Sequence, residues 1–374
     1  MAGSELQNGA KEWRAAILGM SVWGPGLEGW DASRPILAGL QDYVARESSP
    51  PPPSILSATE RRRTGLAVRL ALTAAQQASE MAGVSPGKVR AIFGTANGDG
   101  PVVHAILESL AGPDRVVSPT LFHNSVHNAA AGYWTIATRS HQPTTSLSCH
   151  DDTFAACLLK AALEVAKEPE PVLLVVYDAP LPEPLGSKRP TAAPFAAGLV
   201  LAPQHTTGAR AELAIQYLAG QPGRISAQPR ADPAQVDAPS SHERVNRLAD
   251  EELERFHVSG NRSGARWLKP DAGSHFASTG SHFAPQNGGP ELGSRSSETD
   301  RALKPNTLEH DYLGLKSSCS SVAALRSLSE GNPAGRALPL LGLLALGQSG
   351  AFTLNFLDAG LAAAVTPSAA LSTC

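Results

Sequence analysis

Apolar runs and amphipathic stretches alternate along the first two hundred residues. Continuous apolar runs at 13–22, 89–93 and 195–202 are typical of strands that are covered on both faces. Stretches rich in Ala and Leu at 64–82 and 151–166 have the spacing of helices. Further predicted elements are strands at 144–148, 172–177 and 351–357 and helices at 102–110, 122–137 and 337–346. This alternation predicts a layered α/β fold with a mixed sheet.

The pattern changes after residue 203, where Ser, Gly, Pro and charged residues dominate until order returns near Asn332. Such a segment has too few clustered aliphatic side chains to offset the entropy of ordering. We therefore expect a domain at 13–203 and a low-complexity, disordered insertion at 204–331. A closing helix and strand at 332–360 would belong to the same domain.

Composition excludes several classes of protein. The chain has 374 residues, of which 42% are hydrophobic, which is ample for a buried core. A formal net charge of -3 provides no excess positive charge to attract a polyanion, so nucleic acid is not an expected partner. The four cysteines lack zinc or disulfide spacing, which favours a reducing compartment. No apolar run is long enough for a membrane span, so we expect a cytoplasmic protein.

One cysteine lies between a predicted strand and a predicted helix. Cys149 follows the strand at 144–148 and precedes the helix at 151–166, where helix N–H groups and the helix dipole stabilise a thiolate. That position suits acyl transfer, in which a thiolate attacks a thioester and backbone donors hold the oxyanion. Ionised Asp151 and Asp152 would raise the thiol pKa, and buried cysteines are often inert. Both the nucleophile and the inert residue therefore remain open.

Two histidines lie four residues apart in the predicted helix at 122–137. His123 and His127 would share one helix face, which is the spacing of a metal site, but no third ligand is signalled. We favour the alternative that they and the neighbouring asparagines line a subunit contact or bond to buried backbone. We expect no metal and no cofactor, and we keep both histidines as candidates to assist Cys149.

Several blocks of the chain, in order, resemble the β-ketoacyl synthase-like N-terminal domain family. The opening Ala-Ile-Leu-Gly-Met and the turn at Gly94 fall in the expected order. The resemblance covers about 13–203, and 332–358 is similar to the closing segment of the family. The blocks that carry it are 118–134, 145–156, 178–180 and 195–201.

The resemblance implies a thiolase-like fold with α/β/α/β/α layers and a role in fatty-acid or polyketide assembly, here of the polyene type. It implies acyl carrier protein as a partner, and it aligns Cys149 with the nucleophile of active members. The chain departs from the family downstream: it has no His-Gly-Thr-Gly-Thr-like segment and no Asn-Ser-Phe-Gly-Phe-Gly-Gly-like segment. The C-terminal half is therefore expected to be incomplete or divergent.

Three hypotheses follow. In the first, the protein is a non-condensing subunit similar to a chain-length factor, which forms a homo- or heterodimer with a ketosynthase through 123–134. In the second, it is an active β-ketoacyl synthase or acyltransferase that uses Cys149, aided by His123 or His127. In the third, it is a degenerate scaffold whose insertion at 204–331 binds a partner.

Overall fold

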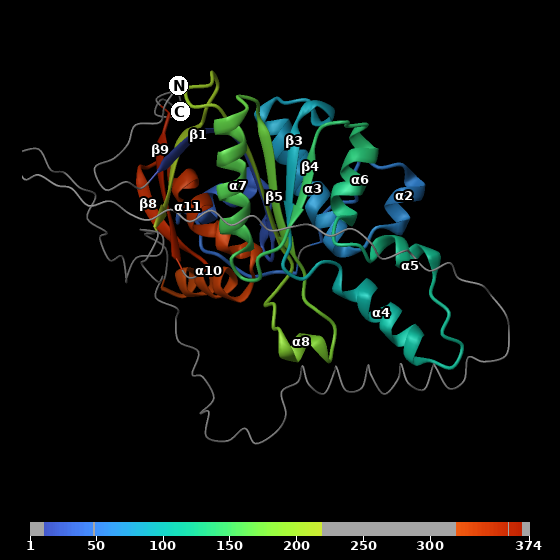
Figure 1. Ribbon diagram of the computed structural model, residues 1–374. Helices are drawn as coiled ribbons and strands as arrows, with labels where there is room; N and C mark the ends of the chain where they lie inside the picture. The colour runs from blue at the N-terminus through green and yellow to red at the C-terminus, as the bar shows by residue number, and fades with distance from the viewer. Residues whose placement is uncertain (1–10, 48, 219–318, 358, 369–374) are drawn as a thin grey trace, which may run out of the picture. The chain divides into compact units, whose positions relative to one another are not determined.

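The computed structural model describes residues 11–47, 49–218, 319–357 and 359–368, and their strands form one mixed sheet (Figure 1). The strands are β1 (Glu12–Gly24), β2 (Leu27–Glu28), β3 (Arg90–Gly94), β4 (Thr144–Leu147), β5 (Val172–Asp178), β6 (Phe195–Ala202), β7 (Ala211–Leu218), β8 (Gly350–Phe356) and β9 (Ala359–Pro367). Their order across the sheet is β4-β3-β5-β6-β1-β7-β9-β8, and the short β2 pairs with β1 beside this path.

The parallel pairs of the sheet lie at one edge. β3 runs parallel to β4 and β5, and Gly94 at its end is opposite Leu147 of β4 and Val176 of β5. All other pairs are antiparallel. The carboxyl ends of β3, β4 and β5 therefore meet, and in open α/β sheets this is where sites are built.

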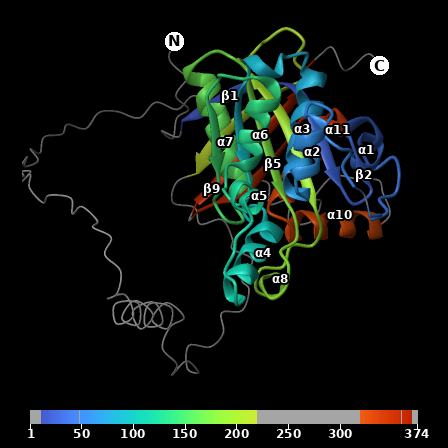
Figure 2. The same ribbon diagram turned by 90° about the vertical axis from the view of Figure 1, so that its right-hand side faces the viewer.

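Helices cover both faces of the sheet (Figures 1 and 2). They are α1 (Trp30–Leu37), α2 (Ala58–Arg63), α3 (Leu66–Ala82), α4 (Gly100–Ala111), α5 (Pro119–Asn124), α6 (Ala129–Thr138), α7 (Thr153–Lys167), α8 (Leu185–Lys188), α10 (Cys319–Gly331) and α11 (Leu338–Leu346), with short 3-10 turns at Pro86–Lys88 and Ala334–Ala337. α3 and α6 pack on one face, whereas α1, α7, α10 and α11 pack on the other. Burial of both faces explains the continuous apolar runs of β1, β5 and β6.

The described residues confirm the α/β class that the sequence predicts. The predicted α/β/α/β/α layers would require two sheets. The strands of the described ranges form a single sheet with helices on both faces. No helix in these ranges is both long and apolar enough to cross a membrane.

The predicted single helix at 122–137 is wrong, because the chain breaks it between α5 and α6. The buried Asn124 side chain donates to Arg63 O (2.8 Å) and accepts from the Tyr133 hydroxyl (2.9 Å). The Ser125 hydroxyl donates back to Phe122 O (2.9 Å). Short polar side chains that bond to nearby backbone favour turns over helix interiors. His123 and His127 therefore do not share a helix face.

Two described elements fall inside the range assigned to the insertion. β7 lies after residue 203, and α10 ends just before Asn332. The remainder of the predicted insertion, 219–318, lies outside the described residues and stays a prediction. The closing segment also runs further than expected, since β9 ends at Pro367.

Candidate functional site

The candidate site lies at the carboxyl ends of β3, β4 and β5. Cys149 follows β4, and α7 begins four residues later at Thr153. Its side chain is half-buried, whereas Cys157, one helical turn into α7, is fully buried. The structure therefore places Cys149 on the strand-to-helix turn that the sequence predicts.

The turn at Cys149 is held by short-range hydrogen bonds. Its backbone N–H donates to Thr153 Oγ1 (3.0 Å), and that hydroxyl donates to His150 O (2.7 Å). The Asp152 N–H donates to Cys149 O (2.9 Å). His150 has a φ of 51°, a left-handed conformation that is uncommon outside glycine. These bonds reverse the chain sharply between β4 and α7.

The surroundings of Cys149 disfavour its thiolate. Burial raises the pKa of the Cys149 thiol, and the Asp152 carboxylate raises the pKa further. A thiol with a raised pKa is largely protonated at neutral pH, and a protonated thiol is a poor nucleophile.

Neither predicted histidine forms a hydrogen bond with the thiol in the described ranges. His127 Nε2 lies 3.2 Å from Thr95 O, just beyond the end of β3. The His123 ring packs edge-on against Tyr133, with 5.9 Å between the ring centroids. Among the described residues, no imidazole nitrogen is within hydrogen-bonding distance of Cys149 Sγ. The structure does not bring the three candidate residues into one hydrogen-bonded group.

Arg189, which belongs to none of the predicted motifs, holds this turn in place. Arg189 Nη2 donates to Asp151 Oδ1 (3.0 Å), and Nη1 contacts the imidazole of His150. Its Nε donates to Asn97 Oδ1 (2.8 Å). Arg189 thus ties the two residues after Cys149 to the loop that follows β3.

A buried carboxyl supports the same loop from below. Asp178, the last residue of β5, is fully buried, and its Oδ1 accepts from Thr95 Oγ1 (2.8 Å), Ala96 N (2.9 Å) and Asn97 N (2.9 Å). Its Oδ2 has no hydrogen-bond partner in the described ranges. Burial raises the pKa of Asp178 to about 6, although these donors act in the opposite direction. An acidic residue closing an apolar strand is the one sequence signal that could have pointed to it.

Close packing places α7 against the end of β3. A Cβ on Gly94 would lie 2.4 Å from Cys157 Sγ and 3.1 Å from both Thr153 Cγ2 and Val176 Cγ1. Only a residue without a side chain permits this approach. Gly94 therefore sets how near the start of α7, and with it the Cys149 turn, can lie to the sheet.

Comparison with known proteins shows which family these features belong to. The family model of the β-ketoacyl synthase N-terminal domain matches residues 38–268, well over half of the chain. The chain belongs to this family. The match spans the Cys149 turn and runs past residue 203 into the range that the sequence assigned to an insertion. The family resemblance that the sequence indicated is therefore confirmed.

Similar solved structures include one with a TM-score above 0.5. The ishigamide ketosynthase/chain length factor is similar to this chain at 12% identity with a TM-score of 0.52, and the match covers 95% of this chain and 99% of that one. The ketosynthase ApeO in complex with its chain length factor ApeC, from Xenorhabdus doucetiae, is 23% identical with a TM-score of 0.45, covering 55% of this chain and 84% of that one. No curated protein matches the chain. The family match and the ishigamide structure together confirm the thiolase-like α/β class.

Proposed function

We propose that this β-ketoacyl synthase family member is a cytoplasmic, non-condensing subunit, similar to a chain-length factor, of a complex that assembles fatty acids or polyene-type polyketides. The state of Cys149 carries the proposal. Its thiol has a raised pKa and, among the described residues, no imidazole to accept its proton. A ketosynthase-like fold with a poorly activated thiol suits a subunit that shapes or supports the site of a partner.

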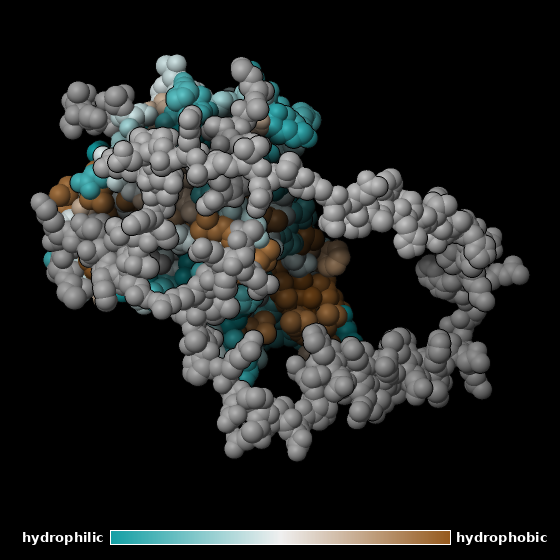
Figure 3. Space-filling view, turned by 60° about the vertical axis from the view of Figure 1, so that its left-hand side comes forward, coloured by the Kyte–Doolittle hydropathy of each residue, from teal (hydrophilic) through white to brown (hydrophobic). Residues whose placement is uncertain are grey.

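An exposed apolar surface supports pairing with such a partner. β4 is an edge strand of the sheet and packs against α6, and α6 and the two helices before it, α4 and α5, expose large apolar side chains. Leu107 is 52% exposed, Phe122 69% and Ile136 62%. We call this the α4–α6 surface; its other exposed members are Val103, Leu110, Val116 and Val126. Apolar residues also reach the surface in the view of Figure 3.

The partner argued from this surface is an active ketosynthase. Contiguous exposed apolar area marks protein contacts, and an uncovered sheet edge needs a neighbour. The ishigamide protein, which shares the fold, is named as a ketosynthase/chain length factor. The α4–α6 surface contains part of the 123–134 contact that the sequence favours, and acyl carrier protein would then meet the complex rather than this subunit alone.

Co-purification with a ketosynthase from the same organism tests the proposal. We expect a stable complex that is lost in Leu107→Glu and Phe122→Glu. Leu40→Glu is the matched control, because Leu40 is 78% exposed and lies after α1, outside the α4–α6 surface. Absence of any complex would overturn the proposed function, whereas a complex that survives both substitutions would overturn only the assigned surface.

A second function is favoured by the position of Cys149. A half-buried thiol on a strand-to-helix turn is placed for acyl transfer if a partner lowers its pKa. Incubation with acyl carrier protein thioesters, with and without the ketosynthase, followed by intact-mass measurement, decides between the two. An adduct that is absent in Cys149→Ala would establish acyl transfer, and lack of an adduct would leave the non-condensing role. The scaffold hypothesis rests mainly on residues 219–318, which lie outside the described ranges.

A further inference from the structure

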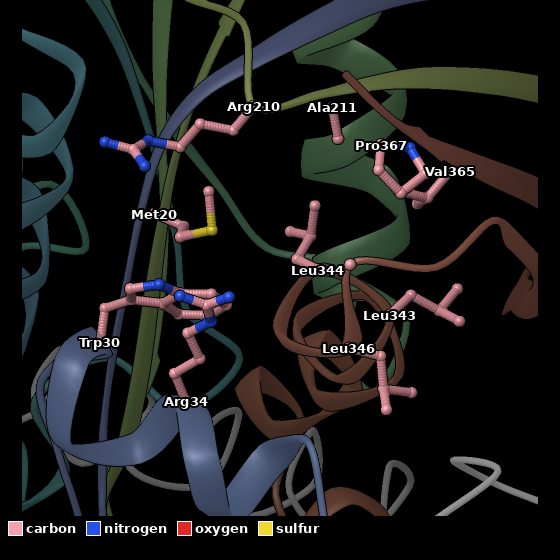
Figure 4. A pocket seen from close by; sticks show the side chains of 11 residues that line it. Met20, Trp30, Arg34, Arg210, Ala211, Leu343, Leu344, Leu346, Val365 and Pro367 are labelled. Carbon is pink, nitrogen blue, oxygen red and sulfur yellow. The ribbon is translucent and has the colours of Figure 1, made fainter. Parts of the chain in front are cut away.

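A second candidate site lies away from Cys149, in a cavity of about 190 Å³. None of its lining residues belongs to α7 or to β3, β4 or β5, which build the Cys149 turn. Figure 4 shows the cavity between β1, α1, the end of α11 and the start of β7. It is lined by Met20, Trp30, Arg34, Arg210, Ala211, Leu343, Leu344, Leu346, Gly347, Val365 and Pro367.

The cavity lies where β1 and β7 stop pairing. β1 pairs with β7 only as far as Ile17, opposite Ala211, whereas its pairing with β6 continues to Trp23. Beyond Ile17, therefore, β7 no longer pairs with that edge of β1. Met20 lies in this second half of β1, and α1, α11 and β9 close round it without filling the space.

Two arginines lie on one side of the cavity. The pairing of β1 with β6 is irregular between Ile17 and Gly19, and the carbonyl of Leu18 there accepts from Arg210 Nε (3.1 Å). This bond fixes the Arg210 side chain against β1 and uses one of its donor nitrogens. Its two Nη atoms have no hydrogen bond or ion pair in the described ranges. A bulge in β1 thus provides the anchor for a charged group.

Arg34 supplies the second charge. It lies in the last turn of α1, where the helix dipole stabilises a positive charge, and its side chain is exposed. Within the part of the chain that the structure describes, its guanidinium has no hydrogen bond or ion pair. In Figure 4 the two arginines lie above and below Met20.

The opposite side of the cavity is apolar. Figure 4 shows Leu344, Val365 and Pro367 across the space from the arginines, and Leu343 also lines the cavity. No acidic side chain lines the cavity, so its charge is purely positive. Arginine recognises carboxylate and phosphate through paired N–H donors. One face of the cavity therefore suits an oxyanion and the other a hydrocarbon.

We infer that this cavity binds a small amphipathic anion, which places a carboxylate or phosphate on the side of the two arginines, beside Met20, and a short hydrocarbon chain against Leu344 on the opposite side. The volume is below the ~300–1,000 Å³ of pockets for drug-sized ligands, so the chain is short, about six carbons. The inference does not rest on the proposed function, because it uses none of the residues at Cys149.

Titration calorimetry on the full chain with three six-carbon probes tests the inference. Hexanoate and hexyl phosphate carry the two head groups, and hexanol carries none. We expect saturable binding of at least one anion, at least about tenfold tighter than that of hexanol, since charge-assisted hydrogen bonds are about twice as strong as neutral ones. The tighter of the two anions identifies the head group. Equal binding of all three probes, or no binding, would overturn the inference.

Variants locate the binding. Arg34→Gln and Arg210→Gln should each weaken the preferred anion by about tenfold or more, and Leu344→Trp should abolish its binding by filling the cavity. Arg62→Gln, an exposed arginine on α2, is the matched control and should bind as the unmodified protein does. If Arg210→Gln fails to fold, Arg34→Gln and Leu344→Trp decide. Binding that survives both of those substitutions would overturn the site, whatever the outcome of ketosynthase co-purification.

Discussion

Asp152 Oδ2 accepts a hydrogen bond of 2.8 Å from the backbone N–H of Leu357. One partner is the residue before α7, and the other lies in the turn between β8 and β9. The C-terminal hairpin therefore braces the turn that carries Cys149. The same carboxylate raises the pKa of that thiol, so a single side chain serves both position and electrostatics.

Removing the charge of Asp152 should make Cys149 more reactive. Asp152→Asn keeps an oxygen to accept from Leu357 but removes the negative charge, so the thiol pKa should fall. We expect severalfold faster alkylation of Cys149 by iodoacetamide at pH 7.5, followed by peptide mass spectrometry. Asp114→Asn, an exposed and remote carboxylate, is the control and should react at the original rate. Equal rates in both variants would mean that burial alone sets the pKa.

Removing Arg189 should loosen the same turn. Arg189→Ala deletes charge-assisted bonds to Asp151 and Asn97, and we expect a loss of about 1–3 kcal/mol in the free energy of unfolding. Urea denaturation measures this loss. Lys188→Ala, one residue earlier and exposed, should change stability by less than about 0.5 kcal/mol. Matching curves for the two variants would contradict the role of Arg189 as a clamp.

Asp178 should make stability depend on pH. Its pKa is raised from 3.8 to about 6, so between about pH 4 and pH 6 the folded state holds a proton that the unfolded state releases. The free energy of unfolding therefore falls as pH rises through this window, by on the order of 3 kcal/mol in total.

The variant Asp178→Asn has no carboxyl to titrate and should lack this part of the slope. Urea denaturation of both proteins from pH 4 to pH 7 gives the comparison, because other carboxyls contribute equally to each. A constant difference in free energy across the window would show that the pKa of Asp178 is not raised in the folded protein.

Two glycines should respond oppositely to alanine. Gly94→Ala places a Cβ 2.4 Å from Cys157 Sγ, and overpacking of this kind costs about 1–3 kcal/mol. Gly132→Ala, inside α6 with nothing within 4 Å of the new Cβ, should stabilise by up to about 1 kcal/mol. Thermal unfolding reads out both. Adding Cys157→Ala to Gly94→Ala should recover part of the loss, and no recovery would argue against that contact.

Most strands were predictable because they are buried on both faces. β1, β5 and β6 are continuous apolar runs, and their observed ranges nearly coincide with the predicted ones. β7 and β9 were not predicted from the sequence, for different reasons. β7 alternates polar and apolar residues in a polar region, and β9 is rich in alanine, which has low strand propensity. Their mutual pairing, a long-range effect, makes them strands.

The candidate site was predictable only in part. The position of Cys149 follows from local order, since an apolar strand and a helix flank it. The contacts of Arg189 do not, because Asn97 and Asp151 are far from it in the sequence and the helix before it, α8, is too short to show a periodic pattern. The break before His127 was missed because the alanines of α6 disguised a turn fixed by Asn124.

The length and position of β1 have a consequence for folding during synthesis. Apart from the two residues of β2, its partners are β6 and β7, which begin at Phe195 and Ala211. During translation, the apolar β1 is therefore synthesised long before β6 and β7, the strands that pair with it. Pairing over such separations is slow and exposes a nascent chain to aggregation. Recovery of folded protein should depend on chaperone supply more than its final stability would suggest.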